Sequence, residues 1–440
     1  MVLSFYKLVL RDTTILGGKF MKKQKKLFIG LITLMSTLLI FGGCGNNDSA
    51  SSGKKEIEVF STKNAENTDI LKKLAKEFEA ENEGVTIKIT SPADAGTVLK
   101  TRLTKNDIPD VLAMGGDATF AELKEAGVLE DMTEESYLDD VKDSYKKMVT
   151  DLYEGDDIYG VPYATNASGV LYNKDIFEKE NIEVPKTWSE FKTACEALKE
   201  KGIQPLELTF KDSWTALPIC NSLAPSMEPE DFNQERQDNK TTFSKDFKDI
   251  AQRYLDTLDY AQKDFMGTTY ADGNQAFAQG KAAMMVNGNW AIPEFKKINS
   301  DINVDIFPFP STDDEEKNYV TSGVDVLFAV GADSKMKDEA KDFVTFMMKK
   351  ENATAYINDQ FAFSAITGVE QNDSSLTGVK TAIENGKVAD FPDHAYPAGF
   401  DLASLLSGMA LDKTNNVEDN KNIVDFLKKA DEAYDTANVN

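Results

Sequence analysis

The sequence contains few of the residues that build metal, redox and nucleophile sites: 3 Cys and 1 His among 440 residues. It has no CxxC pair and no Cys/His cluster, so a zinc site is not expected. A serine triad would depend on His394, and the G-x-S-x-G elbow that carries such a serine is absent. We therefore expect neither a metal nor another cofactor, and we look for function outside redox and triad chemistry.

Basic residues are also scarce relative to acidic ones. Lys and Arg total 49 against 74 Asp and Glu, which gives a formal net charge of −25. A chain this acidic is repelled by nucleic acid and by anionic lipid headgroups, and it has no compensating basic run beyond its first residues. Nucleic acid is thereby excluded as a partner, and we interpret the acidic residues as a solvated surface.

The sequence has one long apolar run, residues 27–41, which follows a lysine-rich stretch at 22–26. The run is shorter than the roughly 20 residues that span a bilayer, and a charged start with a short apolar run predicts a secretory signal. The small residues that end it, Gly42-Gly43-Cys44, resemble the lipobox of bacterial lipoproteins, in which the cysteine is lipidated. Phe41 and Gly42 depart from the residues commonest there, and an ordinary signal peptide with an incidental Cys44 is the alternative.

These features divide the N-terminal part of the chain. Residues 1–20 are predicted to be an untranslated upstream extension, with Met21 as the start; a long charged region before the signal is the alternative. Residues 21–43 are predicted to be the signal peptide. Residues 44–55 are small and polar, which is typical of a flexible tether. We expect a protein anchored by lipid to the outer face of the cell membrane, in a Gram-positive bacterium.

Two cysteines remain, Cys195 and Cys220. They could pair in an oxidising compartment. However, Cys195 lies within a helical pattern at 188–201, and free cysteine is commonly buried. We predict two unpaired thiols.

Beyond the tether, strand and helix patterns alternate. Residues 56–61 alternate apolar and polar positions, 69–82 carry a helical apolar face, and 85–89 again read as a strand. A helix at 98–103, a strand at 109–114 and a helix at 118–126 follow. The pattern predicts an α/β fold with a mainly parallel sheet, and the length predicts two domains, since single cores stop growing at roughly 250–300 residues. Ligands of such sheets bind at the carboxyl ends of strands, here 61–64, 115–117 and the loop after Phe210.

A series of motifs then resembles the extracellular solute-binding proteins of ABC importers, in the carbohydrate-binding group. Each motif alone is weak, but five occur in the family's order and they cover the chain from Cys44 to Asn440. The motifs are Gly160-Val161-Pro162 with Leu171-Tyr172-Asn173-Lys174, Pro185-Lys186-Thr187-Trp188-Ser189-Glu190-Phe191, Phe277–Met284, Gly288-Asn289-Trp290, and Thr321–Asp325 with Phe328–Val330 and a helix at 337–349.

The resemblance implies a two-lobed, periplasmic-binding-protein-like fold of type II, with the ligand in a cleft between lobes and several hinge crossings. We expect the chain to cross at 162–165, near 321–324, and after a helix ending near 350. Lobe one is then 54–163 plus 322–350, and lobe two is 164–321 plus 351–440. The resemblance also implies a monomer that closes on a carbohydrate and delivers it to the membrane permease subunits, which a cytoplasmic ATPase drives.

A sugar needs aromatic rings for its C–H faces and planar polar side chains for its hydroxyls. Trp290, at the end of a predicted strand, is the first candidate platform, and Trp214, in a polar loop, is the second; Trp188 is predicted to pack in the core. Asp117 follows Gly115-Gly116 at a strand end, where similar proteins bind sugar hydroxyls. The further candidates are Asn64, Asn166, Asp325, Phe363 and His394, with core packing the alternative for Phe363 and a structural role the alternative for His394.

Two other functions remain open. A secreted lipoprotein that acts on glycosides needs two carboxylates at a set spacing, and so acidic a chain always offers some pair. A polyamine or peptide receptor needs carboxylates near aromatic rings, which the strand ends do not obviously provide. Nothing in the sequence selects a catalytic residue, so we expect a binding protein and not an enzyme.

Overall fold

The computed structural model describes residues 55–63, 68–92, 95–397 and 399–438. Cys44, Asn64, the predicted signal peptide and nearly all of the predicted tether lie outside these residues; Lys55, the last tether residue, already begins a strand. Among the described residues, no helix is both long enough and apolar enough to cross a membrane.

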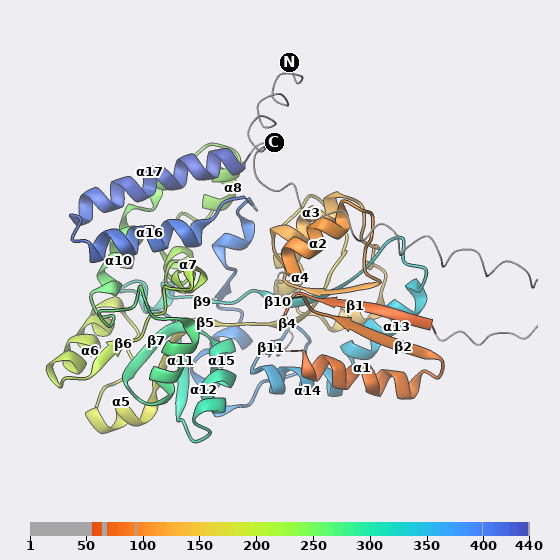
Figure 1. The fold of residues 1–440 in the computed structure, drawn as a ribbon, viewed down its shortest axis with the longest axis horizontal. Coiled ribbons are helices and arrows are strands. Elements are labelled where there is room, and N and C mark those ends of the chain that lie inside the picture. The colour runs from red at the N-terminus through yellow and green to blue at the C-terminus, as the bar shows by residue number, and fades with distance from the viewer. Residues whose placement is uncertain (1–54, 64–67, 93–94, 398, 439–440) are drawn as a thin grey trace, which may run out of the picture. The chain divides into compact units, whose positions relative to one another are not determined.

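The first of two mixed sheets has the strand order β11-β4-β10-β3-β1-β2. Figure 1 shows this sheet with α1, α13 and α14 beside it. β1 pairs in parallel with β2 and β3, whereas β10 runs antiparallel to β3 and β4. The strands of this sheet and the helices of its lobe are β1 (Lys55–Ser61), α1 (Asp69–Glu81), β2 (Val85–Thr90), α2 (Ala95–Leu103), β3 (Val111–Met114), α3 (Ala118–Glu125), η2 (Ser136–Asp140), α4 (Asp143–Thr150), β4 (Val161–Thr165), β10 (Val324–Val330), α13 (Lys337–Met348), α14 (Lys350–Gln360) and β11 (Phe363–Ser364).

The second sheet has the order β12-β9-β5-β7-β6, and β8 also pairs with β5. Here β5 runs antiparallel to β7, β8 and β9, whereas β6 runs parallel to β7 and β9 runs parallel to β12. The strands are β5 (Ser168–Asn173), β6 (Gln204–Leu206), β7 (Ala282–Gly288), β8 (Val304–Phe307), β9 (Val320–Thr321) and β12 (Val388–Ala389).

Helices complete the lobe of this second sheet, some packed on the sheet and others packed on other helices. They are α5 (Lys174–Glu180), α6 (Trp188–Glu200), η3 (Ser213–Ala216), α7 (Leu217–Met227), α8 (Phe232–Gln237), α9 (Phe243–Asp246), α10 (Lys248–Leu258), α11 (Tyr270–Ala278), η4 (Asn289–Ala291), α12 (Ile292–Ile298), η5 (Glu315–Lys317), η6 (Ser374–Leu376), α15 (Thr377–Glu384), η7 (Pro392–Ala395), α16 (Leu402–Thr414) and α17 (Asp419–Ala437).

Two expectations about the fold were wrong. The sheets are mixed and not mainly parallel, because β4, β5 and β10 each return antiparallel to their neighbours. The expected lobe boundary at 350/351 also falls too early, since β11 pairs with β4 in the first sheet. The sequence of a short apolar strand such as β10 does not show whether it runs parallel or antiparallel to its neighbours. The strand directions and the extent of the first sheet are therefore known only from the tertiary structure.

Local signals were more reliable. Thr187 and Glu190 form the predicted capping box at the start of α6. Trp188, the first residue of that helix, is only 3% exposed and packs in the core, as predicted. Cys195 and Cys220 are buried free thiols, which confirms that prediction. Burial raises the pKa of both thiols, so they are poor nucleophiles.

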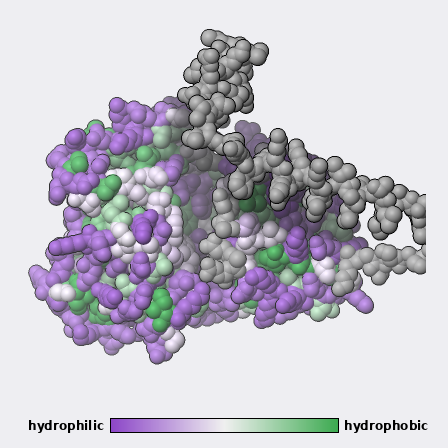
Figure 2. Space-filling model, viewed as in Figure 1, coloured by the Kyte–Doolittle hydropathy of each residue, from purple (hydrophilic) through white to green (hydrophobic). Residues whose placement is uncertain are grey.

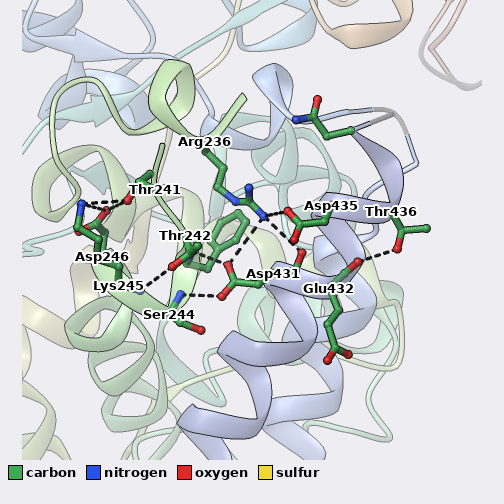
Figure 3. Close-up of polar contacts among 12 residues, drawn as sticks. Arg236, Thr241, Thr242, Ser244, Lys245, Asp246, Asp431, Glu432, Asp435 and Thr436 are labelled. Carbon is green, nitrogen blue, oxygen red and sulfur yellow. Dashed lines mark hydrogen bonds and ion pairs between the residues drawn. The ribbon is translucent and has the colours of Figure 1, made fainter. Parts of the chain in front are cut away.

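The C-terminal helix α17 is fastened to the second lobe by a buried arginine (Figure 3). Arg236, 1% exposed, pairs with Asp435 and lies 3.9 Å from the Asp431 carboxylate. Its guanidinium also lies 4.2 Å from the ring centroid of Tyr434. Asp431 in turn accepts hydrogen bonds from the backbone N–H groups of Phe243 (2.7 Å) and Ser244 (3.2 Å) at the start of α9. A single cluster therefore joins α8, α9 and α17.

The face shown in Figure 2 is dominated by hydrophilic residues, with hydrophobic ones scattered among them. This agrees with the acidic composition and with a solvated surface.

Candidate ligand-binding site

A cavity of about 630 Å³ lies where residues of both sheets' lobes meet. Ligand pockets are typically about 300–1,000 Å³ and are lined by apolar and aromatic groups with a few polar ones, which this cavity matches. Five of the eight predicted ligand-binding residues line it: Asn166, Trp214, Trp290, Asp325 and His394. The other lining residues are Thr62, Lys63, Leu217, Pro218, Asn221, Tyr270, Ala271, Glu294, Phe391 and Asp393.

Two of the other three predicted residues do not line this cavity. Asp117 caps α3, where its Oδ1 accepts hydrogen bonds from the N–H groups of Thr119 (2.9 Å) and Phe120 (3.2 Å). It also lines a neighbouring cavity of about 280 Å³. Phe363 is 4% exposed in β11 and packs in a hydrophobic core, the alternative that its sequence left open. Asn64 lies outside the described residues.

The aromatic side chains of the cavity all come from the second lobe. Trp290 lies in η4 directly after β7, and its ring is 6.5 Å from that of Phe391 at an interplanar angle of 47°. Trp214 is 41% exposed and meets the ring of Tyr270 edge-on at 5.0 Å. An exposed indole supported by a second ring is the geometry that a stacking platform needs.

The structure shows why the G-x-W motif has a glycine at position 288. A Cβ at this position would lie 2.1 Å from Cζ3 of Trp290, so only glycine lets the indole lie against the end of β7. The residue two before the tryptophan thus places the predicted platform.

The first lobe contributes an ion pair. Lys63 Nζ lies 2.5 Å from both carboxylate oxygens of Asp325, and each side chain is about a quarter exposed. Lys63 follows β1 and Asp325 lies at the start of β10, so two strands of the first sheet that flank β3 bring the charges together. The pair presents polar groups to the cavity while neutralising its own charge.

His394 is held by carboxylates. Its Nδ1 lies 3.0 Å from Oδ1 of Asp390, and its ring packs against Phe391 at 5.0 Å. Burial alone lowers the pKa of His394, but the charges of Asp390, Asp393 and Asp117 outweigh burial and raise the pKa to about 9. The imidazole is therefore a cation at neutral pH.

Asp393 is stabilised differently. Its Oδ1 accepts a hydrogen bond of 2.9 Å from Nδ2 of Asn221, a residue of α7. Burial raises the pKa of Asp393, despite the opposing charge of His394. The carboxyl is thus less readily ionised than an exposed aspartate.

The cavity adjoins two chain crossings between the sheets. The first lies between β4 and β5 at residues 166–167, and the second lies between β9 and β10 at 322–323, whereas crossings were expected from the sequence at 162–165 and near 321–324. The buried Tyr145 hydroxyl lies 3.2 Å from Ser322 Oγ and accepts from Thr165 Oγ1 at 3.3 Å. One tyrosine of α4 therefore contacts both crossings.

Several lining residues were not selected from sequence. Lys63, Phe391 and Asp393 lie within stretches that contain selected residues, and a wider choice of neighbours would have included them. Asn221 and Tyr270 lie in helices α7 and α11, and no strand-end pattern marks them. Within the part of the chain that the structure describes, no group of three or more His, Cys, Asp or Glu is placed to hold a metal ion.

Comparison with known proteins places these features in context. Residues 64–354 match the family described as bacterial extracellular solute-binding protein. A multiple sugar-binding protein of Streptococcus mutans is 32% identical over 369 residues, which cover 81% of this chain and 86% of that protein. A melibiose/raffinose/stachyose-binding protein of Bacillus subtilis is 24% identical over 80% of this chain and 82% of its own.

Solved structures confirm the two-lobed α/β fold. The apo form of RafE from Streptococcus pneumoniae superposes with a TM-score of 0.73 at 24% identity, covering 90% of this chain and 100% of that one. A Bacillus subtilis binding protein in an open conformation gives a TM-score of 0.75 at 20% identity, covering 89% and 100%.

Proposed function

We propose that this chain, which belongs to the bacterial extracellular solute-binding protein family, binds a neutral sugar or oligosaccharide and delivers it to an ABC permease. The observation that carries the proposal is the charge balance of the aromatic cavity. Lys63 is paired with Asp325, and His394 with Asp390. Glu294 is paired with Lys297 at 2.8 Å.

A cavity whose charges are satisfied within the protein favours an uncharged ligand. A cationic ligand would have to compete with Lys63 for Asp325, at the cost of leaving this partly buried lysine unpaired. A neutral, hydroxyl-rich ligand can instead accept and donate hydrogen bonds while its C–H faces stack on Trp214 and Trp290. This argues against the polyamine and peptide alternatives.

The same pairing argues against a glycosidase. A retaining or inverting enzyme needs one carboxylate as nucleophile or base and a second as acid. Asp325 is held by Lys63 through both oxygens, and Asp393 is held by Asn221. Members of the family bind solutes, and we propose that this chain too has no catalytic activity.

The arrangement supports a hinge mechanism. Lys63 and Asp325 belong to the first lobe, and the aromatic residues belong to the second. A ligand that contacts both sets binds the closed arrangement better than an open one, so it shifts the population toward closure. The closed lobes would then dock on the permease.

We further propose that the protein acts as a monomer tethered at the outer face of the membrane by lipid on Cys44. A relative from Streptococcus pneumoniae, 24% identical over 76% of this chain and 78% of its own, is named a maltooligosaccharide ABC transporter solute-binding lipoprotein. A receptor that cannot diffuse away from its permease meets it at a higher effective concentration. Incorporation of labelled palmitate into wild type, with Cys44→Ser as control, tests the anchor.

Isothermal titration calorimetry of the purified protein tests the ligand class. Raffinose, stachyose and maltotriose are the neutral probes; spermidine and a tripeptide are the charged ones. We expect a saccharide to bind without being hydrolysed. Since ionic screening acts on charged ligands, the saccharide affinity should change by less than about twofold between about 50 and about 500 mM NaCl. Binding of spermidine but of no saccharide, or release of cleaved sugar, would overturn the proposal.

A further inference from the structure

We propose that the ligand is an oligosaccharide long enough to occupy two adjoining cavities, passing between them beside Leu217, Asp393 and His394. These three residues line both the cavity of about 630 Å³ and the neighbouring one of about 280 Å³. The inference rests on the proposed sugar-binding function and specifies which sugars that site takes. We refer to the larger space as the aromatic cavity and to the smaller one as the polar cavity.

The two cavities differ in chemistry. The aromatic cavity is lined by Trp214, Tyr270, Trp290 and Phe391, which suits the stacking of sugar rings. In the polar cavity, charged and hydroxyl side chains border the space beyond the shared residues. These polar side chains are Lys100, Asp117, Thr119, Tyr396 and Asp401, and five apolar residues complete the wall.

The polar groups of this second space are held in place by the protein. Oδ1 of Asp117 accepts hydrogen bonds from two N–H groups of α3. These bonds fix the carboxylate while leaving its other oxygen, Oδ2, outside them. Asp401 caps α16 by accepting from the backbone N–H of Ser404 at 3.0 Å. Lys100 pairs with Glu122 at 3.3 Å. Acceptors fixed as Asp117 and Asp401 are can recognise hydroxyl groups without a large ordering cost.

The polar cavity is also shared between the lobes. Lys100 and Asp117 belong to the first lobe, whereas Tyr396 and Ala403 belong to the second. A sugar unit seated here would therefore contact both lobes, as the unit in the aromatic cavity does. Each added unit would strengthen closure, so longer saccharides should bind more tightly than short ones.

His394 is placed to separate the two subsites. It borders both cavities, and Asp390 fixes its ring through Nδ1. A cationic imidazole at the junction can donate Nε2–H to an oxygen of the bound chain. This assigns a use to the lone histidine, and it gives Asp117 a role in the polar cavity instead of the aromatic one.

Filling the polar cavity tests the inference. Ala403 is half-buried near the start of α16 and lines only the polar cavity, so Ala403→Trp should occupy that space. Calorimetry is carried out with melibiose, raffinose and stachyose, and with maltose, maltotriose and maltotetraose. In wild type, affinity should rise by about tenfold or more from the disaccharide to the longer members of the series that binds, because the added units form hydrogen bonds to charged groups.

In Ala403→Trp that increase should disappear while disaccharide affinity stays unchanged. Asp117→Asn keeps a good helix cap and should weaken only the longer saccharides. Leu411→Trp, which introduces the same side chain at an exposed position of α16, is the matched control and should behave as wild type. If a saccharide binds but its affinity is independent of length, or neither cavity variant alters the dependence, the inference is wrong. If no saccharide binds wild type, the proposed function itself fails.

Discussion

Asn166 and Gly323 join the two chain crossings through a reciprocal pair of hydrogen bonds. Oδ1 of Asn166 accepts from the N–H of Gly323 at 3.0 Å, and the N–H of Asn166 donates to the Gly323 carbonyl at 3.2 Å. Asn166 also lines the aromatic cavity. The two crossings and the candidate ligand site therefore share a residue, and this residue bonds one crossing to the other at the wall of the cavity.

Gly323→Ala should destabilise the protein. The added Cβ would lie 2.5 Å from Oδ1 of Asp390 and 3.0 Å from Cε1 of His394. Asp390 cannot easily move, because the same oxygen accepts from the N–H of Phe391 at 2.7 Å. Overpacking of this kind costs about 1–3 kcal/mol, and we expect ligand affinity to fall as well.

Urea unfolding and calorimetry measure these two effects of Gly323→Ala. Gly96→Ala is the control, because Gly96 lies in α2 and a Cβ added there would meet no other atom within 4 Å. That change should stabilise the helix by about 0.5–1 kcal/mol. Equal behaviour of the two variants would show that the crossing tolerates a side chain.

Trp290→Ala should lower saccharide affinity by about tenfold or more, because it removes both the buried area and the stacking of an aromatic platform. Trp290→Phe should retain part of the affinity. The far-UV circular dichroism spectrum and the thermal midpoint check that the fold persists. If calorimetry gives wild-type affinity for Trp290→Ala, the indole does not contact the ligand.

The pKa of His394 should be near 9, well above its ordinary value near 6.5. A raised pKa means that the protonated ring contributes stability fully below about pH 6.5 and that this stability is lost as pH rises through about 9. Because the chain has one histidine, its Cε1–H resonance in a proton–carbon NMR titration is unambiguous.

Asp390→Asn provides the comparison for that titration. It removes the carboxylate bonded to Nδ1 of His394, so the pH at the midpoint of the His394 titration should move down toward about 6.5. The thermal midpoint of wild type should fall between about pH 7 and about pH 10 by more than that of His394→Gln. If the wild-type His394 titrates with a midpoint near pH 6.5, the charges around the ring do not raise its pKa as expected.

Arg236→Ala should lower the free energy of unfolding by about 2–3 kcal/mol, because it empties a buried site and frees α17 from α8. The loss is smaller than for two fully buried partners, since Asp435 is 61% exposed and can be resolvated. Lys428→Ala removes an exposed α17 pair with Glu432 and should change stability by less than about 1 kcal/mol. Urea unfolding of both variants measures the two losses. If Arg236→Ala costs no more than Lys428→Ala, Arg236 does not hold α17 in place.

The candidate site shows how far residue type and position carry a prediction. Trp290 and Trp214 could be selected because Trp290 follows the end of a predicted strand and Trp214 lies in a polar loop after one, where ligands of such sheets bind. Phe363 could not be separated from core packing, because a two-residue strand pairs it with Thr165 and buries it. Asn221 and Tyr270 were missed because their helices are apolar or mixed, and a helix pattern does not say which residue faces a cavity.

The sequence by itself determined the class of fold, the family and the local elements, because capping boxes, apolar periodicity and ordered motifs depend only on neighbouring residues. Only the tertiary structure decided the direction of the central strands, the extension of the first sheet to β11, and the pairing of Lys63 with Asp325. Those features join residues up to 262 positions apart, and their energy depends on distances that the chain acquires only when it is folded.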